Sequence, residues 1–304
     1  MNDYLSTPHQ DGDLDVSDIA RKRLGLHYTA PDGSQRPFDL YYPETGEGPF
    51  PLIVNISGGG WYYGHPSSIH LGRSLHTAVA RGYAFASLAC VSSREQKFPF
   101  QVQEARQALR FLRQHAGELS LDPEFFALWS SSSGAHLSLL TALTRGDPYF
   151  DCQPDSPISD QVDAVVALYP CCRLDATVED FRAIGLEPVN YRSGPRCAES
   201  IFLGALVEES PELCRLAAPI THVRPDMPPV MALHGMADTV IPYTYTVEFI
   251  QRCREVAGAD RVVSCIVPGA GHSDPYFKSE EMCGRILDFL DRAKNQKRAA
   301  DISR

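Results

Sequence analysis

The sequence lacks any long apolar run. No stretch of its 304 residues reaches the roughly 18 consecutive apolar residues of a membrane-spanning helix. The polar, acidic start contains no apolar segment typical of a signal peptide. Basic residues are also few, since 28 Lys and Arg face 38 Asp and Glu, and the net charge of −10 disfavours nucleic acid and anionic membrane surfaces. We therefore expect a cytoplasmic protein with a neutral or weakly charged small-molecule ligand.

Paired cysteine motifs are absent as well. Nine cysteines are scattered without a Cys-x-x-Cys pair, and their odd number fits reduced thiols better than a disulfide framework. Adjacent Cys171 and Cys172 have no nearby histidine pair that would indicate a redox or metal site, so we interpret them as buried, inert thiols. We expect neither a metal nor an organic cofactor.

The chain does contain a regular alternation of short apolar and longer amphipathic segments. Helices are expected at 101–115, 133–145 and 286–293. Residues 23–29 and 36–42 alternate polar and apolar side chains, as antiparallel strands at a sheet edge do. Together with the buried strands listed next, this order predicts an α/β fold with a doubly wound, mostly parallel sheet and ligands at the C-terminal strand ends. Six apolar runs have the length of strands buried on both faces: 51–57, 83–91, 125–129, 164–169, 230–234 and 262–267.

One domain accounts for most of the chain. We expect it at residues 21–293, after a flexible leader at 1–20 and before a frayed tail at 294–304. Residues 171–211 interrupt the alternation with glycines, prolines and mixed polar residues. We predict a small cap insertion there, over the C-terminal edge of the sheet. The sequence is compatible with a homo-oligomer.

A run of serines follows the apolar segment at 125–129. Strand, SSSSGA at 130–135 and helix match a nucleophile elbow, in which small residues stand two before and two after the serine. Ser132 fits this pattern with Gly134, whereas Ser133 fits it only in a register that keeps no glycine. We predict Ser132 as the nucleophile, with Ser133 as the alternative.

Three glycines in the motif SGGGW follow the first long buried strand. Backbone N–H groups in such a run can approach a ligand closely and stabilise an oxyanion. We predict an oxyanion hole from Gly59, Gly60 and the amide of Ser133. Trp61 and Tyr62 are candidates for a substrate-binding wall, and packing in the core is the alternative for both.

A serine nucleophile requires a base, which in turn requires an acid to orient it. Asp238 lies in the loop after the strand at 230–234, and His272 lies in the glycine-rich loop after 262–267. Both loops are expected at the sheet edge that carries Ser132, so we predict these three residues as the catalytic set. Other candidates fit less well. We interpret His234 and His136 as structural residues, and His65 as a residue at the surface or in contact with substrate. Asp260 and Asp274 do not have the position of Asp238 in a loop at the C-terminal end of a strand.

Together these motifs resemble the hormone-sensitive-lipase-like and feruloyl/acetyl-xylan esterase branch of the α/β-hydrolases. The matching motifs are SGGGW, SSSSGAHL, HGMADTVIP and GAGH, and the resemblance covers about residues 23–293. The order Ser, Asp, His is that of the α/β-hydrolases. The resemblance implies a serine esterase that acts without a cofactor on short-chain or aromatic carboxylic esters, including acetyl or feruloyl groups on carbohydrate. The chain departs from the family at Ser57, in place of a histidine, and at Ser130, in place of the elbow glycine.

Two other interpretations stay open. The same triad serves amidases such as aryl-formamidases and also peptidases. A different class is a catalytically silent α/β-hydrolase that acts as a binding protein, which the serines at positions 57 and 130 make conceivable. A panel of ester, amide and peptide substrates distinguishes an esterase from an amidase or a peptidase. Comparison of ester hydrolysis by wild type and by Ser132→Ala tests for a catalytically silent protein.

Overall fold

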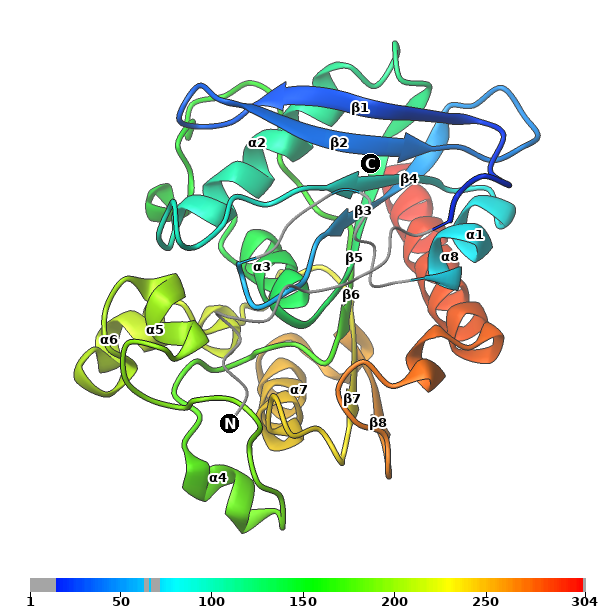
Figure 1. Ribbon diagram of the computed structural model, residues 1–304. Coiled ribbons are helices and arrows are strands. Elements are labelled where there is room, and N and C mark those ends of the chain that lie inside the picture. Colours follow the sequence, from blue (N-terminus) through cyan, green and yellow to red (C-terminus); the bar gives the residue numbers. More distant parts are fainter. Residues whose placement is uncertain (1–14, 63–65, 67–71, 303–304) are drawn as a thin grey trace.

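A computed structural model describes residues 15–62, 66 and 72–302. A sheet of eight strands runs through it in the order β1-β2-β4-β3-β5-β6-β7-β8 (Figure 1). β1 pairs antiparallel with β2, and β2 with β4, whereas the other neighbours are parallel. This confirms the predicted mostly parallel α/β fold with an antiparallel edge. The strands are β1 (Lys22–Thr29), β2 (Gln35–Tyr41), β3 (Phe50–Ile56), β4 (Ala84–Leu88), β5 (Leu121–Ser131), β6 (Ala164–Leu168), β7 (Val230–Gly235) and β8 (Val262–Val267).

Helices cover both faces of the sheet. Side chains alternate along each strand, so that Ile53 packs in one hydrophobic cluster and its neighbours Leu52 and Val54 in the other. Because both faces are covered, the central strands are mostly apolar, with a few buried polar residues such as Asn55 and Ser87. No helix in the described ranges is long and apolar enough to cross a membrane. One face carries α1 (Arg73–Ala80) and α8 (Glu280–Ile302), and the other carries α2 (Phe100–Gln114), α3 (Ser132–Leu143) and α7 (Tyr243–Ala257) (Figure 1).

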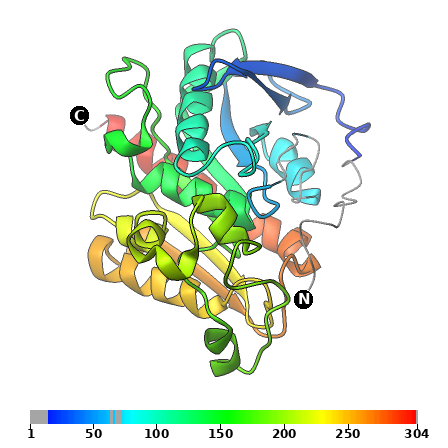
Figure 2. The same cartoon turned by 60° about the vertical axis from the view of Figure 1, so that its left-hand side comes forward.

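The segment between β6 and β7, called the cap below, contains the residues 171–211 that were predicted as a cap insertion. It lies on the same side of the sheet as α3 and α7 (Figures 1 and 2). A capping box of Thr177 and Asp180 begins its first helix, and Gly204 in a left-handed conformation ends the second. The helices are α4 (Val178–Ala183), α5 (Ala198–Leu203) and α6 (Pro211–Leu216), with short 3-10 turns η2 (Val207–Glu209) and η3 (Pro219–His222). The cap segment thus extends beyond the predicted insertion at 171–211.

Both predicted flexible ends contain ordered structure. Helix α8 continues to Ile302, so most of the tail expected to fray at 294–304 is helical. Lys297 Nζ lies 2.9 Å from a carboxylate oxygen of Asp163, an ion pair that holds this end of the helix against the domain. In the leader predicted at 1–20, residues 1–14 lie outside the described part, but Ile19 is buried in the hydrophobic cluster under α1 and α8.

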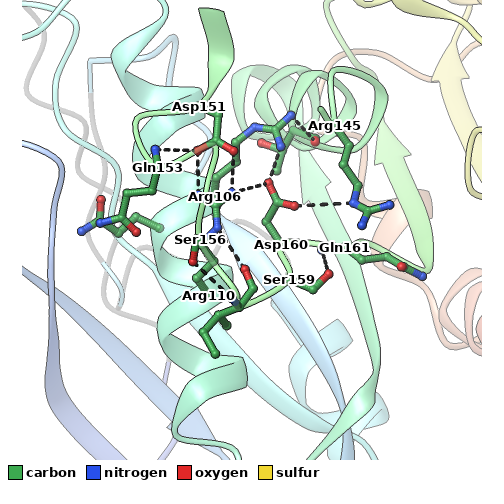
Figure 3. Close-up of polar contacts among 12 residues, drawn as sticks. Arg106, Arg110, Arg145, Asp151, Gln153, Ser156, Ser159, Asp160 and Gln161 are labelled. Atoms are coloured by element: carbon green, nitrogen blue, oxygen red, sulfur yellow. Dashed lines mark hydrogen bonds and ion pairs between the residues drawn. The ribbon is translucent and has the colours of Figure 1, made fainter. Parts of the chain in front are cut away.

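Buried charges attach the loop between α3 and β6 to helix α2 (Figure 3). Arg106 donates a hydrogen bond to Asp160, which also accepts one from Arg110 at 3.3 Å. Arg110 Nη1 donates to Asp151 Oδ1 at 2.7 Å, and Arg145 lies 3.6 Å from Asp160 at the exposed end. A buried charge that loses its partner is strongly destabilising. The network therefore determines how the loop at 151–160 packs.

All nine cysteines are free. Cys171 and Cys172 are buried, as predicted, and burial raises the pKa of both thiols. Within the described residues, no group of three or more His, Cys, Asp or Glu side chains is placed to hold a metal ion.

Candidate active site

Ser132 lies where β5 ends and α3 begins, at the C-terminal edge of the sheet. Its φ of 53° is in the left-handed region, which non-glycine residues adopt rarely. The turn also requires Gly134, because a Cβ at that position would lie 2.1 Å from the carbonyl oxygen of Ile56. The structure thus forms the sharp strand-turn-helix junction of a nucleophile elbow.

Ser132, His272 and Asp238 form one hydrogen-bonded chain. Ser132 Oγ lies 3.1 Å from His272 Nε2, and His272 Nδ1 lies 2.7 Å from Asp238 Oδ2. The other carboxylate oxygen of Asp238 accepts hydrogen bonds from the amides of Val240 at 2.8 Å and Ile241 at 2.9 Å. The structure therefore brings together the three residues predicted as the catalytic set.

The protonation states of this chain follow from its surroundings. Burial on its own disfavours a charged carboxylate, but the electrostatic attraction of His272 and the hydrogen bonds from His234 and His272 outweigh it and hold the pKa of Asp238 well below its usual range. An ionised carboxylate only accepts hydrogen bonds. His272 Nδ1 is therefore the protonated nitrogen, and Nε2 is free to accept the proton of Ser132. Ser133, the alternative nucleophile, does not contact His272; its hydroxyl is buried without a hydrogen-bond partner in the part of the chain described.

His234, which we expected to be only structural, contacts Asp238. Its Nε2 lies 3.0 Å from Asp238 Oδ2, and its Nδ1 lies 2.7 Å from Thr246 Oγ1. The ring is fully buried at the end of β7. Because Asp238 accepts from Nε2, Thr246 donates to Nδ1, and this fixes the ring orientation. The signal was available in the sequence, since His234 stands four residues before Asp238 in the motif HGMAD.

The predicted oxyanion residues line the cavity that contains Ser132. Gly59 and Gly60 adopt φ values of 115° and 63°, in the left-handed region that glycine tolerates. Ser133 lies in the first turn of α3, whose amides have no partner within the helix. All three residues border the cavity together with Ser132 and His272. The arrangement is suited to holding a negatively charged oxygen next to the nucleophile.

The two serines that depart from the family pattern both make buried hydrogen bonds. Ser57 Oγ donates to the carbonyl of Leu88 at 3.0 Å, which attaches the glycine loop to β4. Ser130 Oγ accepts from the amide of Ile56 at 3.0 Å and from Ser138 Oγ at 2.9 Å. Ser57 thus attaches the glycine loop to the sheet, and Ser130 connects β5 to β3 and to α3.

Trp61 and Tyr62 line the cavity and are also packed in the core, with 7% and 6% of their surface exposed. Trp61 Nε1 donates to His136 Nδ1 at 3.2 Å, and its ring stacks on Phe202 of α5 with centroids 4.7 Å apart. Burial lowers the pKa of His136 to about 4, so the ring is neutral and donates through Nε2 to the carbonyl of Ala217 at 2.8 Å. His136 thus connects the oxyanion loop to the cap segment.

The cap supplies the remaining wall of the cavity. Arg192 Nη1 lies 3.2 Å from Glu199 Oε1 and donates to the carbonyl of Val240 at 3.2 Å. The amide of Val189 donates to the carbonyl of Thr239 at 3.1 Å. The cap is therefore attached to the loop that carries Asp238. Its cavity-lining residues are Cys171, which the sequence analysis interpreted as a buried thiol, and six that the sequence did not indicate: Asn190, Tyr191, Arg192, Arg196, Ala198 and Glu199.

Backbone strain is concentrated around the site. Five non-glycine residues in the described chain have positive φ, and Trp61, Ser132 and Ser273 among them line the cavity. A fourth, Tyr169, has φ 39° and packs its ring against His272 with centroids 4.6 Å apart. Such strain persists where the surrounding structure enforces it, and it is common at functional sites.

The rejected candidates lie elsewhere. Asp274 accepts a hydrogen bond from the amide of Tyr276 at the start of a 3-10 turn, η5 (Pro275–Lys278). Asp260 precedes β8, at the strand end opposite to His272. His65 lies outside the described residues.

Comparison with models of protein families identifies the family of this chain. The BD-FAE model matches residues 38–252. The chain belongs to the BD-FAE family of α/β-hydrolases. The match runs from β2 into α7 and includes Ser132 and Asp238, whereas His272 lies beyond it.

Curated relatives are identical to this BD-FAE protein at about a quarter of the aligned positions. Esterase LipC of Mycobacterium tuberculosis is 28% identical over 230 residues, which are 74% of this chain and 53% of LipC. A probable isoprenylcysteine alpha-carbonyl methylesterase, ICMEL1 of Arabidopsis thaliana, is 26% identical over 277 residues, 86% of this chain and 53% of the relative. The chain thus spans about half the length of these relatives.

Solved structures share the fold. A truncated carbohydrate esterase from gut microbiota superposes with a TM-score of 0.76 at 23% identity, over 93% of this chain and 100% of that one. Esterase 2 of Thermogutta terrifontis, solved with propionate bound, gives 0.67 at 20% identity over 91% of this chain and 96% of the esterase. These likenesses confirm the α/β-hydrolase fold.

Proposed function

We propose that this BD-FAE protein is a serine esterase that hydrolyses short-chain or aromatic carboxylic esters, with acetyl or feruloyl esters of carbohydrate as its natural substrates. The observation that carries the proposal is the chain Ser132–His272–Asp238, with contacts of 3.1 and 2.7 Å, beside a glycine loop in one cavity. The names of the solved neighbours support the substrate class, since one is a carbohydrate esterase and another binds propionate.

The first half of the reaction acylates the enzyme. Ser132 Oγ attacks the ester carbonyl carbon while His272 Nε2 takes the hydroxyl proton, and Asp238 stabilises the resulting imidazolium. The carbonyl oxygen becomes an oxyanion that the amides of Gly59, Gly60 and Ser133 stabilise, each by about 3 kcal/mol. The bond to the alcohol oxygen then breaks, and His272 returns its proton to the leaving alcohol.

The second half releases the acid. His272 Nε2 takes a proton from a water molecule, whose oxygen attacks the acyl carbon through a second oxyanion. Breakage of the acyl–Oγ bond regenerates Ser132 with a proton from His272. The protein needs no other group for either half, because its residues supply nucleophile, base and oxyanion donors.

Hydrolysis of p-nitrophenyl acetate, butyrate and octanoate tests the proposal. Ser132→Ala should lower kcat by about four orders of magnitude or more, because it removes the nucleophile. The exposed Ser193 supplies a matched control, Ser193→Ala, which should keep wild-type turnover. Equal activity of wild type and Ser132→Ala would refute the assignment, and loss only in Ser133→Ala would shift the nucleophile by one residue. Faster turnover of p-nitroacetanilide than of the esters would indicate an amidase.

A further inference from the structure

Two cap residues that line the cavity containing Ser132 have hydrogen-bonding groups without a partner in the described part of the chain. Asn190 is 9% exposed, and its Oδ1 is buried without a hydrogen-bond partner among the described residues. Arg192 uses Nε and Nη1 for its hydrogen bonds, whereas its Nη2 makes none in the same part of the chain. Both residues line the cavity. A buried acceptor without a partner is costly, so a ligand group that donates to Asn190 Oδ1 removes this cost, and Arg192 Nη2 can add a second hydrogen bond.

The charge of Arg192 is already balanced. Its Nη1 lies 3.2 Å from Glu199 Oε1, and both side chains are less than one tenth exposed. The second oxygen of Glu199 accepts from Cys197 Sγ at 2.9 Å. The guanidinium therefore offers a hydrogen-bond donor to the cavity rather than an uncompensated positive charge.

The chemistry of the two free groups selects among possible ligand groups. A carboxylate provides no proton for Asn190 Oδ1, and an alkyl chain provides neither donor nor acceptor. A hydroxyl group donates and accepts, so it can pair with Asn190 Oδ1, Arg192 Nη2 or both. We infer that Asn190 and Arg192 form a subsite that binds a hydroxyl group of the ester substrate. This inference rests on the proposed esterase function and specifies how that site chooses its substrate.

The hydroxyl can belong to the alcohol or to the acyl part of the ester. Four butyrate-sized esters separate these sources: propyl butyrate as the plain ester, glycerol 1-butyrate with hydroxyls on the alcohol, propyl 3-hydroxybutyrate with one on the acyl group, and monopropyl succinate with a carboxylate. Hydrolysis is followed by pH-stat titration. We expect kcat/KM for at least one hydroxylated ester to exceed that for propyl butyrate by about tenfold or more, since a site built for a hydroxyl rejects the analogue without it.

Variants of Asn190 connect this preference to the subsite. Asn190→Leu, which has no acceptor, should bring the kcat/KM ratio between the preferred hydroxylated ester and propyl butyrate close to one. Asn190→Asp keeps an acceptor oxygen and should retain most of the preference. Asn295 is exposed on α8, so Asn295→Leu serves as the matched control and should keep the wild-type ratio.

Equal kcat/KM for the plain and both hydroxylated esters would overturn the inference, as would fastest hydrolysis of monopropyl succinate or an unchanged ratio in Asn190→Leu. Saturation-transfer NMR on Ser132→Ala distinguishes this failure from that of the proposed function, because it measures binding without turnover. Stronger transfer to a hydroxylated ester than to propyl butyrate, lost in Ser132→Ala/Asn190→Leu, would support the subsite even if the wild type hydrolysed no ester. Equal transfer would refute the subsite whatever the turnover.

Discussion

Restoring the family glycine at position 130 should destabilise this protein. Ser130 lies at the end of β5, fully buried, and its Oγ accepts a hydrogen bond from the amide of Ile56 at 3.0 Å. The backbone pairing of β3 with β5 reaches only Val54 and Leu128, so the Ser130 side chain takes the place of a further backbone acceptor. Ser130→Gly removes this acceptor and leaves a buried N–H without a partner.

The size of the effect follows from two contributions. An unsatisfied buried N–H costs about 1–3 kcal/mol. Glycine inside a strand adds about 0.5–1 kcal/mol through its larger conformational entropy in the unfolded chain. We therefore expect the free energy of unfolding to fall by about 1.5–4 kcal/mol in Ser130→Gly. Ser130→Ala isolates the first contribution and should lose about 1–3 kcal/mol.

Urea unfolding followed by circular dichroism measures these differences, as a lower midpoint at an unchanged slope m. Ser138→Ala is the matched control, because it removes the hydroxyl that donates to Ser130 at 2.9 Å and leaves the acceptor of the Ile56 amide in place. Ser138→Ala should therefore lower the free energy of unfolding by less than Ser130→Ala does. A Ser130→Gly protein as stable as the wild type would show that the serine is a neutral replacement and refute the reasoning.

Two further predictions concern histidines near the site. Because burial lowers the pKa of His136 from 6.5 to about 4, the unfolded chain binds a proton before the folded protein does as the pH falls. The free energy of unfolding should therefore decrease between pH 6.5 and 4, by up to roughly 3 kcal/mol more than in His136→Gln, as measured by urea unfolding at several pH values; parallel pH profiles would contradict this. His234→Leu removes a hydrogen bond to the charged Asp238 and should lower kcat/KM for p-nitrophenyl acetate about tenfold to a hundredfold. His234→Gln keeps a hydrogen-bond donor, so its kcat/KM should fall less than that of His234→Leu. An equal decrease in kcat/KM in the two variants would show that the hydrogen bond to Asp238 does not contribute to activity.

The sequence was most informative where local pattern and burial coincide. Apolar runs predicted the central strands, because a strand covered on both faces must be mostly apolar along its length. Strand β5 shows where this signal fails. The strand begins at Leu121, but its next residues, Asp122-Pro123-Glu124, are not apolar, so the apolar run indicates only the part of the strand that begins at Phe125. Helix α8 shows a second failure, since its last turns depend on the ion pair of Lys297 with the distant Asp163. Long-range pairing of this kind leaves no periodicity in the sequence.

The placement of the three residues that we propose as catalytic was predictable for a topological reason. Ser132, Asp238 and His272 each follow a recognisable strand, and parallel strands bring such loops to one sheet edge. Most residues of the cap that line the cavity, such as Asn190 and Arg192, lie in the loop between α4 and α5, which has no periodic pattern, and only Ala198 and Glu199 belong to a helix. Their roles arise from contacts with distant parts of the chain, such as that between Arg192 and the carbonyl of Val240. These contacts required the folded structure.

Val240 connects the two parts of the site. Its amide donates to Asp238 at 2.8 Å, and its carbonyl accepts from Arg192 at 3.2 Å. A substitution of Arg192 therefore removes a cavity-lining donor and, at the same time, one hydrogen bond that holds the loop of the catalytic acid. Its kinetic effect would combine substrate binding with orientation of His272. Asn190 makes no such contact with this loop in the described structure, so a change in substrate preference on its replacement reports on recognition by the cap alone.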